Sequence, residues 1–175
     1  MPKRLLLVGL LVALAAAPAG QAGRTAAGQA STIQALDAGV LAQLNAIRTA
    51  HGLVPLKLNP TLSAAASQHS DEMVSDGYFA HNSFNGSPFW KRLTRYSNAA
   101  AHGYWSVGEN LLWSSPTVDA PSALRLWMAS PEHRKNILTP SWREIGIAAV
   151  HVDSAPGTFS GQPVTVITTD FGVRH

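Results

Sequence analysis

The chain has 175 residues, of which 13 are basic, 10 are acidic and none is cysteine. The lack of cysteine excludes disulfides, thiolate zinc sites, iron–sulfur clusters and cysteine nucleophiles. Lys3, Arg4 and Arg24 account for the formal net charge of +3 and precede the expected folded domain, so the charges of that domain balance. Since no basic stripe with interleaved aromatic residues follows, we expect no nucleic-acid partner.

The N-terminal residues have the pattern of a secretory signal peptide. A basic start precedes an apolar run over Leu5–Ala17, which is too short to span a bilayer core of about 30 Å. Ala17-Pro18-Ala19 offers small residues to a signal peptidase, which predicts a signal peptide over 1–19. A later cut near Ala22 or Ala27 and an uncleaved N-terminal anchor are the alternatives. We expect a mature chain without a transmembrane segment, secreted or held in the cell envelope.

The next residues lead into a single domain that begins with helices. Residues 20–33 are rich in small and polar residues without apolar periodicity, which predicts a disordered spacer. One folded domain is expected over 34–175. Apolar residues at helical spacing over Leu36–Ile47 predict its first helix, with Gly52 as the C-terminal cap residue. Asn59-Pro60 predicts the start of a second helix, with the asparagine as N-cap.

The second half of the chain alternates strands and helices. Strands are predicted over Val107–Trp113, Ile145–Val152 and Val164–Phe171. A helix with an apolar face ends before Pro131, because the residue before a proline avoids the α region. A short helix then starts with Ser130 as its N-cap. Apolar residues on both faces of the last strand indicate helices on both sides, and hence a layered α/β domain.

Three short segments carry the chemistry: Tyr78-Phe79-Ala80-His81, Gly108-Glu109-Asn110 and Ser130-Pro131-Glu132-His133-Arg134. They supply two imidazoles and a carboxylate, the ingredients of a divalent metal site with an open position or of an acid/base pocket. We predict His81, Glu109 and His133 as ligands of a divalent metal, with zinc as the preferred ion. In the alternative, both histidines are structural and Glu109 forms an ion pair that ties a loop to a helix.

In residue identity and in order along the chain, these segments resemble those of the CAP superfamily (cysteine-rich secretory proteins, antigen five and pathogenesis-related proteins), especially its cysteine-free bacterial members. The similarity covers about residues 36–172. Further matching pieces are Asn45-x-x-Arg48, Gly52-Leu53-x-Pro55-Leu56, Gly86-Ser87-Pro88-Phe89, Trp127-Met128-x-Ser130-Pro131-x-His133-Arg134 and Asp170-Phe171-Gly172. The resemblance implies a three-layer α-β-α sandwich with a central, mainly antiparallel sheet and a cleft across one end.

In that family two histidines and two acidic residues line the cleft. His81, Glu109 and His133 match three of these four positions, and Ser130 stands where many members have the second acid. Glu132 could replace that acid, although neighbours on a helix point about 100° apart, which favours a role at the helix N-terminus. Glu109 and Glu132 are the candidate catalytic groups, and Trp105 and Ser130 are candidate ligand-binding residues.

Three functions are compatible with these residues. The favoured one is a monomeric, secreted binding module whose cleft holds a divalent metal and an extracellular lipid, glycan or peptide. The alternative is a metal-assisted hydrolase of peptides or cell-wall polymers, in which the ion lowers the pKa of a bound water towards about 7. In the third, the triad only braces loops of an interaction domain. No Gly-x-Ser-x-Gly, His-Glu-x-x-His or His-x-x-Glu-His motif is present to decide between them.

Overall fold

A four-stranded sheet forms the centre of the computed structural model, which describes residues 19–97 and 103–174. Its strands are β1 (Lys57–Leu58), β2 (Trp105–Ser114), β3 (Glu144–Val152) and β4 (Val164–Arg174). Their spatial order is β1-β3-β4-β2, with β1 parallel to β3 and the other pairs antiparallel. The three predicted strands and the mainly antiparallel sheet are therefore confirmed. The sequence analysis missed β1, because two residues are too short to show a period.

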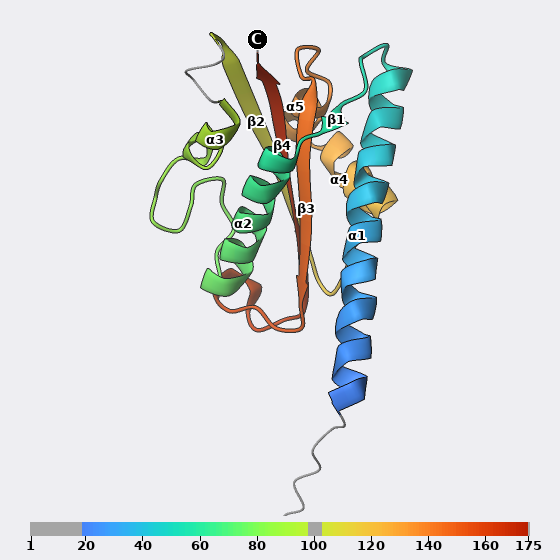
Figure 1. Ribbon diagram of the computed structural model, residues 1–175, viewed down its shortest axis with the longest axis vertical. Coiled ribbons are helices and arrows are strands. Elements are labelled where there is room, and N and C mark those ends of the chain that lie inside the picture. Colours follow the sequence, from blue (N-terminus) through green and yellow to red (C-terminus); the bar gives the residue numbers. More distant parts are fainter. Residues whose placement is uncertain (1–18, 98–102, 175) are drawn as a thin grey trace, which may run out of the picture.

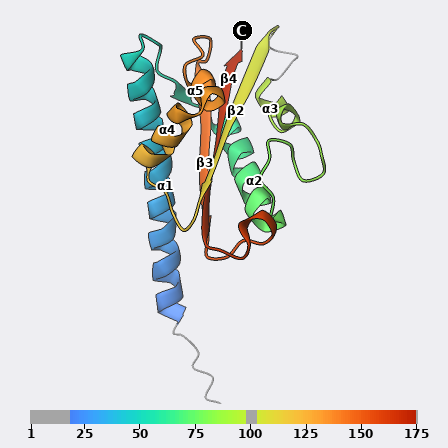
Figure 2. The ribbon, with the colours of Figure 1, turned by 180° about the vertical axis from the view of Figure 1, so that it is seen from behind.

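Helices cover both faces of this sheet (Figures 1 and 2). One face carries α2 (Pro60–Asp76), and the 3₁₀ turn η1 (Phe89–Lys91) and α3 (Thr94–Ser97) follow it in the chain. The other face carries α1 (Ala19–Ala50), α4 (Ala120–Ala129) and α5 (Pro131–Ile137). A 3₁₀ turn, η2 (Gly157–Phe159), lies between β3 and β4. The expected three-layer α-β-α architecture is confirmed.

The first helix begins earlier in the chain than expected. The predicted signal peptide lies outside the described residues except for Ala19, where α1 already begins. Residues 20–33, expected as a disordered spacer, therefore form the first turns of α1. Alanine and glutamine favour helix, and the described side chains between 28 and 32 are exposed. An exposed helix needs no apolar stripe, which is why periodicity gave no signal there.

The predicted helix ends are confirmed by their cap geometry. Asn59 Oδ1 accepts hydrogen bonds from the backbone N–H groups of Thr61 (2.9 Å) and Leu62 (3.1 Å), at the start of α2. Gly52 follows α1 in the left-handed conformation with φ 71°, which glycine adopts at little cost. These caps fix where α1 ends and where α2 begins, and hence the length of the segment between them.

Three groups of buried apolar side chains hold the layers together. Trp127 of α4, Phe171 of β4 and Leu44 of α1 belong to the core between the sheet and the α1–α4 layer. Under α2, close packing is possible because Gly146 of β3 has no side chain: a Cβ there would lie 2.1 Å from the carbonyl carbon of Leu62. Each fully buried large side chain contributes about 1.5–3 kcal/mol, so this packing fixes the sheet that carries Glu109.

Candidate functional site

The structure brings His81 and Glu109 into direct contact. His81 lies in the loop after α2, and its Nδ1 is 2.7 Å from Glu109 Oε1 on β2. The Glu109 side chain is only 1% exposed, whereas that of His81 is 53% exposed. A carboxylate can only accept, so Nδ1–H of His81 donates, and Nε2 is the free ring nitrogen when the ring is neutral. Glu109 thus orients an imidazole that reaches solvent.

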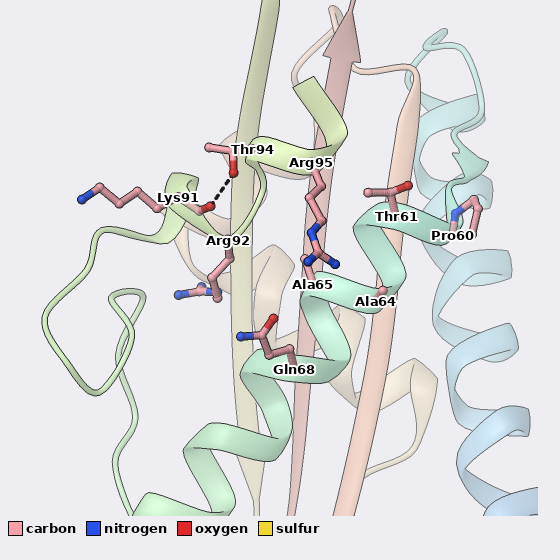
Figure 3. A pocket seen from close by; sticks show the side chains of 9 residues that line it. All are labelled: Pro60, Thr61, Ala64, Ala65, Gln68, Lys91, Arg92, Thr94 and Arg95. Carbon is pink, nitrogen blue, oxygen red and sulfur yellow. Dashed lines mark hydrogen bonds between the residues drawn. The ribbon is translucent and has the colours of Figure 1, made fainter. Parts of the chain in front are cut away.

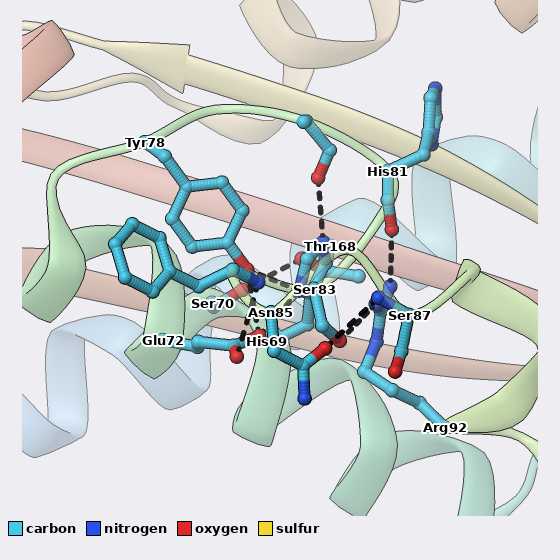
Figure 4. Close-up of polar contacts among 12 residues, drawn as sticks. His69, Ser70, Glu72, Tyr78, His81, Ser83, Asn85, Ser87, Arg92 and Thr168 are labelled. Atoms are coloured by element: carbon cyan, nitrogen blue, oxygen red, sulfur yellow. Dashed lines mark hydrogen bonds and ion pairs between the residues drawn. The ribbon is translucent and has the colours of Figure 1, made fainter.

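Arg92 is the second partner of Glu109 and was not predicted. Its Nη2 lies 2.6 Å from Glu109 Oε2, and the Arg92 side chain is 5% exposed. The same guanidinium donates to the backbone carbonyl of His81 (2.9 Å) and to Ser83 Oγ (3.0 Å), as Figure 4 shows. Arg92 therefore neutralises Glu109 and holds the loop of His81 against β2. The predicted alternative was an ion pair of Glu109 that ties a loop to a helix, and the structure shows such an ion pair holding the loop to strand β2 instead.

A second polar network joins α2 to the same loop. His69 of α2 is fully buried, and its Nε2 lies 2.9 Å from the backbone carbonyl of Ala80, the residue before His81. Tyr78 Oη donates to Glu72 (2.7 Å), which also accepts from the backbone N–H of Phe84 (3.3 Å). Burial lowers the pKa of His69, against the opposing effect of the nearby carboxylates. A neutral His69 therefore acts as a structural donor to the loop.

His133 is held beside β2 by two asparagines. Asn110 Nδ2 donates to the backbone carbonyl of His133 (3.1 Å). Asn136 Nδ2 donates to the backbone carbonyl of Glu109 (3.0 Å) and to Asn110 Oδ1 (2.9 Å). Partial burial lowers the pKa of His133, and the positive charge of His81 lowers it further, while Glu132 opposes this shift. With its pKa lowered from 6.5, His133 is neutral near pH 7.

Arg48 anchors the far end of the helix that carries His133. Its guanidinium is fully buried, and Nη1 donates to the backbone carbonyls of Ile137 (2.7 Å) and Thr139 (3.0 Å) at the C-terminus of α5. Its Nε donates to the carbonyl of Val54 (3.0 Å). A cation at a helix C-terminus is also favoured by the helix dipole. Arg48, like Asn110, therefore positions α5 and does not act on a ligand.

Asp170 lies underneath the site, opposite Glu109 in the pairing of β2 with β4. It is fully buried, and within the described residues no hydrogen bond of normal geometry reaches either of its carboxyl oxygens. Burial raises the pKa of Asp170 well above its usual value, and the charge of Glu109 raises it further, while Arg92 opposes this shift. The burial of Asp170 therefore favours its protonated form.

The described residues do not fit the predicted three-ligand metal site as they are placed. Within 19–97 and 103–174, no group of three or more histidine, aspartate or glutamate side chains is arranged to hold a metal ion. Both oxygens of Glu109 are already engaged, one with His81 and the other with Arg92. It would have to give up one of these partners to bind an ion. The metal therefore stays a prediction, with two imidazoles as its available ligands.

The other predicted site residues are less closely connected. Trp105 begins β2, is half-buried, and shares a strand face with Glu109 by the two-residue period. Ser130 is the N-cap residue of α5, as predicted, but its side chain makes no capping hydrogen bond there. Glu132 is exposed in the first turn of α5. Roles in ligand binding for Trp105 and Ser130, and in catalysis for Glu132, stay predictions.

Comparison with known proteins identifies several bacterial relatives. The chain is 34% identical to the YkwD protein of Bacillus subtilis (strain 168) over 125 residues, which is 71% of this chain and 46% of YkwD. It is 30% identical over 109 residues to the B. subtilis membrane protein YlbC, which is 62% of this chain and 30% of YlbC. The chain thus spans less than half the length of these curated relatives. Within the residues described, no helix is both long and apolar enough to traverse a bilayer.

Solved structures agree with the architecture. An extracellular protein containing a SCP domain from Bacillus anthracis superposes with a TM-score of 0.58 at 26% identity, over 81% of this chain and 42% of that one. An outer surface protein from Borrelia burgdorferi gives a TM-score of 0.58 at 18% identity, over 77% of this chain and 90% of that one, and shows the fold alone. Residues 41–166 match the CAP family, described as the cysteine-rich secretory protein family. The α-β-α fold, the order of the motifs and this match together show that the chain belongs to the CAP family.

Proposed function

We propose that the protein is an extracellular binding module that recognises its ligand through His81 and His133. The observation that carries this proposal is the chain of contacts from Arg92 through Glu109 to His81, with distances of 2.6 and 2.7 Å. A buried carboxylate with an arginine partner holds one imidazole in a single orientation, and that imidazole remains half exposed. Such an arrangement pre-organises a surface group for binding. The likeness to a SCP-domain protein described as extracellular supports the location.

The chemistry of the two imidazoles limits the ligand. A neutral imidazole offers one N–H donor and one acceptor, so the pair can bind the hydroxyl and amide groups of a glycan or a peptide. It can also hold a divalent metal through two nitrogens, with the ligand completing the coordination. A lipid would need an apolar path to this site, and Trp105, at the start of β2, is the candidate for lining one.

Histidine NMR signals would test this proposal directly. The purified chain is titrated with soluble muropeptides, casein peptides and phosphatidylglycerol vesicles, and the ring C–H signals of the histidines are followed. We expect one probe to shift the signals of His81 and His133, and the variants His81→Ala and His133→Ala to weaken its binding about tenfold, the loss of one good hydrogen bond. His51→Ala is the control, since His51 is exposed at the end of α1. Equal binding by the double variant would refute the proposal.

The metal is tested separately by zinc titration of the same variants. If the wild type binds zinc and both His81→Ala and His133→Ala lose this binding, the ion belongs to the binding site. If zinc affinity is unchanged in both variants, the two histidines do not bind the ion, and only the proposal of an organic ligand remains.

A hydrolase remains the second candidate because His81 and Glu109 form a dyad. A histidine oriented by a carboxylate can act as a general base towards a water molecule. The partner that the structure gives to the His81 ring is Glu109 and not a hydroxyl nucleophile. Incubation with casein and with peptidoglycan, followed by mass spectrometry of released fragments, distinguishes the two functions. Turnover by the wild type that His81→Ala abolishes would favour the hydrolase, and its absence would leave the binding module.

A further inference from the structure

A groove separate from the His81–His133 site runs between α2 and the η1–α3 segment. It has a volume of about 690 Å³, within the range of about 300–1,000 Å³ typical of small-molecule sites. Thr61, Ala65 and Gln68 of α2 line one wall, and Lys91, Thr94 and Arg95 line the other (Figure 3). The groove shares Arg92 with the His81 loop, but neither His81 nor His133 lines it. It is large enough for several linked polar groups and more than a single ion requires.

The charge of this groove is positive and uncompensated. Its lining contains three cationic residues and no aspartate or glutamate. Arg92 is neutralised by Glu109, whereas the side chains of Lys91 and Arg95 make no hydrogen bond or ion pair with another residue in the described part of the chain. Figure 3 shows Arg95 extending from α3 toward Ala65, and Lys91 extending outward from the rim. Two cationic side chains without a partner among the described residues therefore face or flank the same groove.

The remaining lining indicates which class of anion fits. The hydroxyl of Thr61 and the amide of Gln68 provide donors and acceptors, whereas Thr94 Oγ1 donates to the backbone carbonyl of Lys91 (2.9 Å) and offers an acceptor. The apolar lining consists of proline and alanine alone. An acyl chain requires large apolar side chains, which the groove lacks. An extended peptide without acidic groups binds by adding to a sheet edge or by filling apolar pockets, and this wall is a helix whose backbone bonds are internal. A hydroxyl-rich anion meets no such obstacle.

We propose that the groove between α2 and η1–α3 binds an acidic oligosaccharide, with Arg95 and Lys91 pairing its carboxylates and Thr61, Gln68 and Thr94 bonding its hydroxyls. This site lies on the opposite face of the sheet from α4 and α5 (Figures 1 and 2). It would give the protein a second point of attachment to an acidic glycan, independent of whatever ligand His81 and His133 bind.

Calorimetric titration of the full chain with tetragalacturonate at low salt tests the proposal. We expect saturable binding that weakens with salt, and a loss of about tenfold or more in the double variant Lys91→Gln/Arg95→Gln. The matched control is Lys135→Gln/Arg125→Gln, which removes the same charge from α5 and α4 and should bind like the wild type. Circular dichroism confirms the fold of each variant.

Three outcomes would overturn the proposal. Equal losses in the two double variants would show that net charge alone attracts the anion. Equal affinity for a neutral maltotetraose would exclude a role for the cations. Equal affinity for tetraglutamate or for inorganic phosphate would show a general anion site and remove the saccharide. Since His81→Ala and His133→Ala do not touch the groove, failure here is distinguishable from failure of the proposed function.

Discussion

Replacing Asp37 by asparagine is expected to stabilise the protein above pH 6. Asp37 lies on α1, and its Oδ1 accepts a hydrogen bond of 2.8 Å from the backbone N–H of Ala149 on β3. Burial raises the pKa of Asp37 from 3.8 to about 6, and the hydrogen bond from Ala149 only partly offsets this effect. The folded chain therefore favours the carboxylic acid, although near pH 7 the carboxylate has to be buried.

The sign and size of the effect follow from this shift. Because the pKa in the folded state lies above the value of 3.8 for the unfolded chain, Asp37 contributes stability below pH 3.8 that is lost as the pH rises through about 6. A shift of about two units corresponds to about 3 kcal/mol, and solvent screening of this partly exposed group reduces the loss to about 1–2 kcal/mol. Asparagine cannot ionise, and its amide oxygen can still accept from Ala149.

Thermal unfolding of wild type and variant at pH 4 and pH 8 measures this loss. For a chain of this size, about 1–2 kcal/mol corresponds to a rise in Tm of about 3–6 °C for Asp37→Asn at pH 8, with little change at pH 4. Asp37→Ala is the control, because it leaves the Ala149 N–H without a partner and should lower the Tm at both pH values. A Tm for Asp37→Asn that is unchanged or lower at pH 8 would refute the reasoning.

Three further predictions concern the site. Asp170→Asn should raise the free energy of unfolding more at pH 8 than at pH 4, because the pKa of Asp170 is raised by burial; a loss at pH 8 in denaturant titrations would mean that Asp170 is ionised. Arg92→Leu should destabilise the protein by about 3–5 kcal/mol, since it leaves Glu109 buried without its cation, and Arg92→Leu/Glu109→Leu should recover much of this loss. Calorimetry of the wild type and these two variants measures both effects. His81→Ala should raise the pKa of His133 by removing a nearby positive charge, which an NMR titration of the His133 ring would show or exclude.

The parts of the fold that sequence predicted are those controlled by local chemistry. Asn59 caps α2 because a short polar side chain can accept from the first backbone N–H groups, whatever the rest of the chain does. Gly52 ends α1 because glycine alone adopts positive φ cheaply. The start of α1 at Ala19 was missed, since exposed alanine and glutamine carry propensity but no period.

The parts of the site that sequence missed depend on three-dimensional pairing. Asp170 faces Glu109 only through the register of β2 with β4, and a motif in sequence does not state which strands are neighbours. Arg92 follows a 3₁₀ turn and has no neighbouring signal that marks it as the partner of a glutamate 17 positions further on. A triad inferred from residue types therefore counted Glu109 as free, and the structure shows both of its oxygens engaged.

The position of the His81 loop and the orientation of the His81 ring therefore both depend on Glu109. Glu109 binds the ring through one oxygen and, through the other, binds the arginine that holds the loop backbone. A ligand that pulls Glu109 away from either partner must loosen both. A ligand that uses only the outward nitrogen of His81 disturbs neither, so it meets a surface that is already organised. Binding through the imidazoles thus costs less free energy of rearrangement than binding through the carboxylate. For this physical reason we assign ligand recognition to His81 and His133 and a supporting role to Glu109.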